Sequence, residues 1–243
     1  LQAIPIGEDP SVRLPVMVCQ DGFITSHALE NIVLLDTDSV KAFVGEYRPE
    51  HYLLKAENPL AVGAYDLGCH YMEHKVQAMK AAKARILEVA ARFEALTGRK
   101  YGLFEAYRME DAEVALVLIG SSAGTAKVAV DQLREQGVKA GLVKIRVFRP
   151  FPAQELAQAL QHVKALAIMD KAESFSANGG PLFSEVRGAL YDLEPRPRTV
   201  GYVYGLGGRD ITPAHFHTVF ARLQAIAAGG ELGPVYTHLG QRG

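Results

Sequence analysis

The chain has 243 residues, and 49% of them are hydrophobic, which supports a full core and argues against disorder. The formal net charge of −1 leaves no basic field to neutralise phosphates, which argues against nucleic acid as a partner. The apolar runs are too short to span a membrane, and Glu8 and Asp9 stand where a signal peptide carries basic residues.

The first hundred residues contain few elements that could bury a core. The apolar run Leu14–Cys19 predicts a buried strand, and Ile32–Leu35 is a second short apolar run. Residues Ser39–Val44 predict a short helix capped by Asp38. A polar, proline-marked stretch over residues 46–68 then predicts an extended surface linker. Either the fold is unusually open or an amino-terminal half is missing, and we favour the second interpretation.

A long helix is predicted over Tyr71–Thr97, ended by Gly98. Its apolar side chains recur at helical spacing and form one stripe: Met72, Val76, Met79, Ile86 and Phe93. Such a helix typically packs against a partner domain or subunit.

From Tyr101 onward, strands and amphipathic helices alternate. The predicted strands are Glu113–Gly120, Lys139–Phe148, Ala165–Asp170 and Thr199–Gly205. The predicted helices are Thr125–Gln136, Ala153–His162, Pro181–Tyr191 and Pro213–Ala227. This order predicts an α/β fold, a mostly parallel sheet with helices on both faces. We expect two domains, residues 1–100 and residues 101–243.

Ligands of such sheets bind at the carboxyl ends of the strands, so three loops are candidate sites. Their residues are Ser121, Ser122, Gly124 and Thr125; Asp170, Lys171 and Glu173; and Gly207, Gly208, Arg209 and Asp210. The first resembles a phosphate cradle, but a tight strand-to-helix turn is the favoured interpretation. The second could perform acid–base chemistry, but we favour a surface ion pair at a subunit joint. In the third, an Asp or Thr helix cap with an arginine held by the neighbouring carboxylate is the simplest interpretation.

A metal site and a serine hydrolase are both poorly supported. Cys69, His70 and His74 lie near a helix start, but there is no second cluster with ligand spacing. There is also no Gly-x-Ser-x-Gly elbow. The two cysteines, Cys19 and Cys69, are too few to hold an iron–sulfur cluster alone and fit a reduced cytoplasm. We expect both to be reduced and free of metal, and Cys19 to react slowly at the end of a buried strand.

Several segments together resemble one known family, and they follow one another in its order. They are LPVMVCQDGFITSH, ENPLAVGAY, YMEHKVQAM, LTGRKYGLFEAYRMEDAEVALVLIGSSAGT, GLVKIRVFRPFP and YGLGGRDITP. The chain thereby resembles the carboxyl-terminal portion of the alpha subunit of pyruvate:ferredoxin oxidoreductases. Its second half also resembles the carboxyl-terminal domain of transketolase-like enzymes. The sequence departs from the family pattern at Cys69, His70 and His74.

The resemblance implies a thiamine-diphosphate-dependent 2-oxoacid:ferredoxin oxidoreductase, with pyruvate as the expected substrate and coenzyme A as acyl acceptor. The intact enzyme would use magnesium and iron–sulfur clusters, whose binding motifs this chain lacks. We therefore expect no catalytic residue here, an inactive isolated chain, and a role as scaffold and subunit interface. The implied partners are the other subunits, ferredoxin through the complex, and an oligomeric assembly in the cytoplasm. The alternative is a non-catalytic transketolase-like interaction or small-ligand-binding module.

The resemblance also places residues 1–19 at the end of a pyrimidine-binding domain, with the loop 21–27 after its last strand. Asp21 is expected to accept nearby backbone amides, and Gly22 to supply backbone freedom. Phe23 is expected to bury its ring against the second domain. The candidate cofactor-proximal or interface residues are Asp21, Gly22, Phe23, Ser26 and His27, and a polar contact is favoured over catalysis for His27.

Overall fold

The computed structural model describes residues 1–49, 52, 54, 56–57, 71–175 and 179–242. Within these residues the chain forms two compact units. The first unit comprises residues 1–19 and 29–102, and the second comprises residues 20–28 and 103–243. The segment 20–28 thus belongs to the second unit, although the residues on both sides of it belong to the first.

The first unit is a small cluster of helices, α1 (Ala3–Gly7), α2 (Thr37–Val44) and α3 (Tyr71–Thr97). Phe43 of α2 packs edge-on against Phe93 of α3, with ring centroids 5.6 Å apart. The side chain that caps α2 is Asp36, which accepts the Ser39 backbone N–H at 2.8 Å; the prediction of Asp38 was wrong. A cap must precede the first turn, and Asp38 already lies inside it.

The predicted buried strand Leu14–Cys19 is wrong in this structure. These residues have no regular secondary structure, and the side chains of Met17 and Val18 are 86% and 81% exposed. The only sheet of the described residues contains none of them, so no strand pairs with their backbone. An extended segment becomes a buried strand only where neighbours satisfy its amides and carbonyls.

Helix α3 has the predicted bounds, and Gly98 follows it with a φ of 69° while its N–H reaches the Glu94 carbonyl. Its buried residues lie between Ala82 and Phe93, and Ile86 and Phe93 belong to the core of the first unit. Met72 and Val76 of the predicted stripe are exposed. Among the described residues, no helix is long and apolar enough to cross a membrane.

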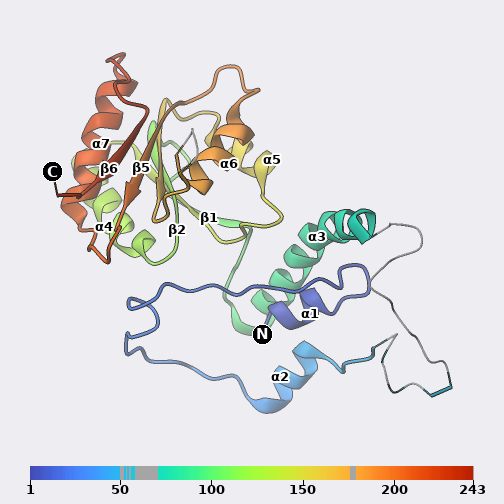
Figure 1. Ribbon diagram of the computed structural model, residues 1–243. Helices are drawn as coiled ribbons and strands as arrows, with labels where there is room; N and C mark the ends of the chain where they lie inside the picture. Colours follow the sequence, from blue (N-terminus) through green and yellow to red (C-terminus); the bar gives the residue numbers. More distant parts are fainter. Residues whose placement is uncertain (50–51, 53, 55, 58–70, 176–178, 243) are drawn as a thin grey trace. The chain divides into compact units, whose positions relative to one another are not determined.

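The second unit is built on a six-stranded sheet in the order β1-β3-β2-β4-β5-β6 (Figure 1). Five strands are parallel: β2 (Val114–Ile119), β3 (Ala140–Ile145), β4 (Ala165–Asp170), β5 (Arg198–Tyr204) and β6 (Tyr236–Leu239). The edge strand β1 (Phe104–Tyr107) is antiparallel to β3. The predicted mostly parallel α/β sheet is confirmed.

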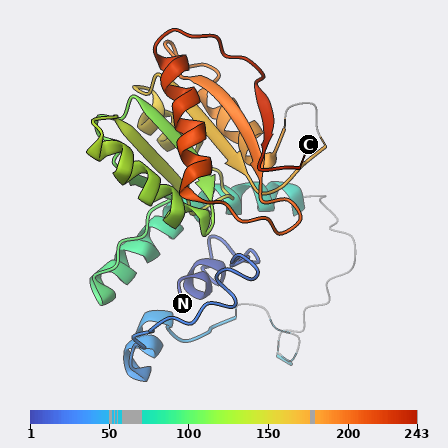
Figure 2. The same ribbon diagram turned by 90° about the vertical axis from the view of Figure 1, so that its left-hand side faces the viewer.

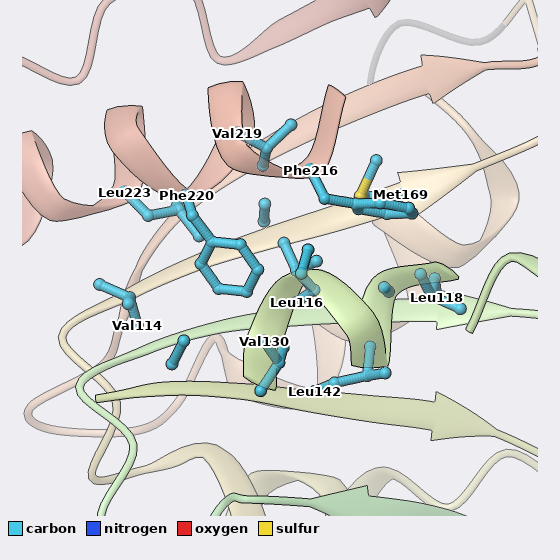
Figure 3. Packing of buried hydrophobic residues seen from close by; sticks show 14 of the residues in the cluster. Val114, Leu116, Leu118, Val130, Leu142, Met169, Phe216, Val219, Phe220 and Leu223 are labelled. Carbon is cyan, nitrogen blue, oxygen red and sulfur yellow. The ribbon is translucent and has the colours of Figure 1, made fainter. Parts of the chain in front are cut away.

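Helices cover both faces of this sheet. Two of them, α4 (Ser122–Glu135) and α7 (Pro213–Ala227), lie in front of the strands in Figure 2. The other two, α5 (Ala153–Leu160) and α6 (Pro181–Leu190), pack on the opposite face. The side chains of β2 alternate between the two layers, as Figure 3 shows for Val114, Leu116 and Leu118 beside Phe216 and Phe220 of α7. Ala115 and Val117 face the second layer.

Two strands and one helix start escaped prediction. The edge strands β1 and β6 are four residues each and only partly buried, so their apolar signal is weak. Helix α4 begins at Ser122 rather than Thr125, so the supposed loop residues Gly124 and Thr125 are already helical.

Candidate functional site

The strands β2 and β4 are neighbours, but the helices that follow them leave toward opposite faces of the sheet. Such a divergence opens a crevice at the carboxyl ends of the two strands, which is where open α/β sheets bind ligands. A cavity of about 240 Å³ lies there. Its apolar lining includes Ile119, Phe148, Met169 and Leu182, and its charged lining is Asp21, Asp170 and Lys171. We define these residues as the switch-point crevice.

Asp170 ends β4 and is buried, with 7% of its surface exposed. Its two carboxylate oxygens accept the backbone N–H groups of Leu182, at 2.9 Å, and Phe183, at 3.0 Å. Burial raises the pKa of Asp170, and these hydrogen bonds offset part of the rise. Asp170 therefore satisfies the amino terminus of α6, which accounts for its burial without an acid–base role.

Asp21 performs a matching task at α4. Its carboxylate accepts the Ser121 backbone N–H from a position one hundred residues earlier in the chain. Partial burial alone would raise the pKa of Asp21, but the hydrogen bonds of Ser121 and the nearby Lys171 outweigh it, so the pKa is lowered. The predicted role of Asp21 as an acceptor of backbone amides is thus right in kind, although the amide is distant in sequence.

The contact explains the phosphate-cradle appearance of residues 120–125. The helix amino terminus attracts an anion, and the carboxylate of Asp21 fills that place. Gly120 has a φ of 89°, and a Cβ there would lie 2.8 Å from an oxygen of Asp21. Only glycine combines this backbone conformation with so close an approach.

The predicted ion pair within residues 170–173 is wrong, because each charged group has a different partner. The ammonium of Lys171 lies 3.7 Å from Asp21. Glu173 instead contacts His238 at 2.9 Å and the Tyr236 hydroxyl at 3.3 Å, both on β6. The strand β6 was not foreseen, so sequence alone could not supply the true partner.

The third loop is organised by a helix cap, as expected in part. Thr212 caps α7, and the His215 side chain accepts the Thr212 backbone N–H at 3.1 Å, which completes a capping box. Arg209 donates to the Gly240 carbonyl at 3.3 Å rather than being held by Asp210. Gly207 and Gly208 adopt φ values of 70° and 75°, which favour glycine.

The loop 21–27 departs from prediction at two residues. Phe23 was expected to be buried but is 81% exposed, with its ring stacked on His27 at 5.1 Å. The positive φ in this loop is that of Phe23, at 63°, and not of Gly22. The Ser26 hydroxyl lies 2.8 Å from Nδ1 of His27, in agreement with the expected polar contact.

Tyr204, at the end of β5, is a residue that the sequence analysis missed. It is 2% exposed, and burial raises its pKa to about 12. The Lys171 ammonium lies 6.0 Å from its ring. The sequence did carry one signal for this residue, because a tyrosine stands at the end of a predicted buried strand, where ligands of such sheets bind.

The described residues contain no group of three metal-ligating side chains. Cys69 and His70 of the weighed metal cluster lie outside those residues. Cys19 lies on the described part and is exposed, which contradicts the expected burial.

Comparison with known proteins gives two family matches. The model described as "Pyruvate flavodoxin/ferredoxin oxidoreductase, thiamine diP-bdg" matches residues 1–92. The model described as "Pyruvate:ferredoxin oxidoreductase core domain II" matches residues 112–216.

Three curated relatives are similar over most of the chain. Pyruvate synthase subunit PorA of Thermotoga maritima is 46% identical over 221 residues, 90% of this chain and 56% of the relative. The subunit of the same name from Methanothermobacter thermautotrophicus is 40% identical over 90% of this chain and 56% of the relative. The alpha subunit of NADH-dependent phenylglyoxylate dehydrogenase of Aromatoleum evansii is 38% identical over 94% of this chain and 58% of the relative. The chain thus spans little more than half the length of these relatives.

Proposed function

Because the chain belongs to the family of pyruvate:ferredoxin oxidoreductase alpha subunits, we propose that it forms part of a thiamine-diphosphate-dependent 2-oxoacid:ferredoxin oxidoreductase. The observation that carries this proposal is the 46% identity to a pyruvate synthase subunit over 90% of the chain. Matches to two successive domains of the same enzyme class support it independently.

The reaction would be the oxidative decarboxylation of a 2-oxoacid to an acyl-coenzyme A, or its reverse. Ferredoxin would take the electrons, and iron–sulfur clusters and magnesium would be held by other parts of the complex. Pyruvate is the proposed substrate, because the pyruvate synthase subunit of Thermotoga maritima is 46% identical to the chain, against 38% for the phenylglyoxylate dehydrogenase subunit. Assembly with other subunits follows from the same relationship.

The switch-point crevice does not fit a diphosphate. The amino termini of α4 and α6 are occupied by the carboxylates of Asp21 and Asp170, which would repel a second anion. Lys171 is the one cation among the residues that line the crevice. We therefore assign no catalytic step to this crevice and propose that the chain supplies scaffold and subunit interface.

Reconstitution tests the proposal. The purified chain would be assayed for pyruvate- and coenzyme-A-dependent reduction of a viologen dye, first alone and then with partner polypeptides. The partners are the other subunits of the Thermotoga maritima enzyme and, as a separate polypeptide, the part of its PorA that this chain does not match.

We expect no turnover by the chain alone and dye reduction in the full mixture, with omission of the chain as the control. Turnover by the chain alone at ordinary enzyme rates of about 1–1000 s⁻¹ would contradict the scaffold role. Failure to co-elute with any partner would contradict assembly into the complex.

A small-ligand-binding module is the second candidate function, and the switch-point crevice favours it. The cavity combines an apolar wall with three charged groups, which is the usual composition of a ligand site. A Lys171→Met variant would distinguish the two functions. Unchanged activity in the reconstituted mixture, together with weaker binding of a small uncharged carbonyl compound such as acetone, would favour the second.

A further inference from the structure

The segment 20–28 is held on the second unit by a narrow set of polar contacts. Within the described residues, its polar contacts to the rest of that unit run through Asp21, to Ser121 and Lys171. Its other hydrogen bonds are internal. Among them, the Phe23 N–H donates to the Ser26 hydroxyl at 2.9 Å, the Ser26 N–H to the Asp21 carbonyl at 3.3 Å, and the Ile24 N–H to the Gly22 carbonyl at 2.8 Å.

Apolar burial adds little to this attachment. Phe23 is 81% exposed and Ile24 is 53% exposed. Because both side chains remain largely in water, their burial contributes little free energy to holding the loop. A carboxylate on a backbone N–H is a charge-assisted hydrogen bond, which is stronger than a neutral one. Asp21 is therefore the main source of the free energy that holds the loop.

The receiving surface is shaped for a carboxylate. Gly120 leaves room where a Cβ would collide, the fourteen-residue helix α4 directs its positive end there, and Ser121 offers no side-chain cap of its own. The Lys171 ammonium also forms an ion pair with the Asp21 carboxylate, with Nζ 3.7 Å from Oδ1. The same carboxylate also forms part of the wall of the switch-point crevice.

We infer that Asp21 is a positioning residue, a latch that fixes the loop carrying Ser26 and His27 against the β2–α4 turn. While the latch is closed, Ser26 and Phe23 orient the His27 imidazole, through the hydroxyl contact at 2.8 Å and the ring stack at 5.1 Å. The outward face of the imidazole is thereby presented in one orientation. Any role of that imidazole in the assembled enzyme rests on the proposed function, but the latch itself does not.

The experiment uses the isolated chain. A negative result therefore counts against the latch alone, whereas failure of the reconstitution counts against the proposed function. Amide hydrogen exchange would be measured for residues 20–28 and for Ser121 in the wild type and in Asp21→Asn. We expect about tenfold or more loss of protection at those amides, because Asn replaces a charge-assisted hydrogen bond by a neutral one and removes the ion pair with Lys171, with β4 and α7 unchanged. Unchanged protection of residues 20–28 in Asp21→Asn would overturn the inference.

A pH profile separates the latch from a general packing role. In the wild type, the Ser121 amide proton shift should titrate below pH 3.8, the ordinary value, because the pKa of Asp21 is lowered. Lys171→Met should move that titration upward, and Asp21→Asn should abolish it. A Ser121 shift that does not respond to pH, or that is unaffected by both substitutions, contradicts the latch.

Two glycine variants serve in case Asp21→Asn alters folding. Gly120→Ala places a Cβ against Asp21, whereas Gly137→Ala has a similar φ of 81° with open space around it. Both carry the cost of a positive φ, but only the first should release residues 20–28. Equal exchange in that segment for the two variants would contradict the inference.

Discussion

The Asp170 carboxylate accepts the backbone N–H of Leu182 at 2.9 Å, which joins the end of β4 to the start of α6 across the loop between them. Asp21 makes the equivalent contact with Ser121 at the start of α4. Two helix amino termini that diverge from neighbouring strands are therefore each closed by an aspartate of the chain itself.

Substitution Asp170→Asn should lower the free energy of unfolding by about 1–3 kcal/mol. The amide keeps one acceptor oxygen but turns an NH₂ group toward the second backbone N–H, which leaves a buried donor unsatisfied. Urea denaturation would measure the change. Asp192→Asn, at an exposed position of the same unit, is the matched control and should change stability by less than about 0.5 kcal/mol. Equal effects of the two variants would contradict a capping role for Asp170.

The two aspartates should impart opposite pH dependence to stability. The pKa of Asp21 is lowered, so its contribution is full above the ordinary value of 3.8 and is lost as pH falls through the folded value. The pKa of Asp170 is raised, so its contribution falls as pH rises from 3.8 through the folded value.

Denaturation between pH 3 and 7 would test this difference. The difference in free energy of unfolding between the wild type and Asp21→Asn should shrink toward low pH. The corresponding difference between the wild type and Asp170→Asn should grow toward low pH. Parallel curves for the two variants would show that the two carboxylates do not sit in different environments.

Phe23→Ala should hardly affect stability, because the ring is 81% exposed. We expect a change below about 0.5 kcal/mol, against about 3–5 kcal/mol for Phe183→Ala, whose ring is 1% exposed. Chemical denaturation of the two variants gives the comparison. A loss of several kcal/mol in Phe23→Ala would restore the sequence-based expectation that this ring is buried.

Cys19 should react readily with a thiol reagent in the folded chain, since its side chain is exposed. The measurement is the rate of aromatic disulfide exchange in a Cys69→Ser background, where one thiol remains. Cys19→Ser in the native background is the control for Cys69. A rate that rises more than about tenfold on denaturation would mean that Cys19 is protected.

Glu173→Gln should loosen the edge strand β6, because Glu173 contacts both His238 and Tyr236 on that strand. Hydrogen exchange at the β6 amides that pair with β5 should accelerate. The pKa of Glu173 is lowered, with the His238 contact as the main cause, so the effect should fade as pH falls below 4.5. Glu231→Gln, at an exposed site before β6, should leave exchange unchanged.

Local pattern was enough to predict the central elements of the second unit. Strand β4 and helices α3 and α7 have the predicted bounds. Their apolar patterns act within a few residues, and Gly98 and Pro213 mark an end of each helix. The parallel sheet follows from the alternation of such elements. The edge strands β1 and β6 carry too little apolar signal to be recognised in the same way.

Only the tertiary structure decided the contacts between distant segments. Three such contacts depend on which strand ends become neighbours. Asp21 caps α4, Asp170 accepts hydrogen bonds from α6 with both carboxylate oxygens, and Glu173 contacts β6. The exposure of Val18 and Phe23 was likewise not readable from their apolar character. Apolar side chains favour burial, but they become buried only where other parts of the fold pack over them. Among the described residues, nothing packs over these two side chains closely enough to bury them.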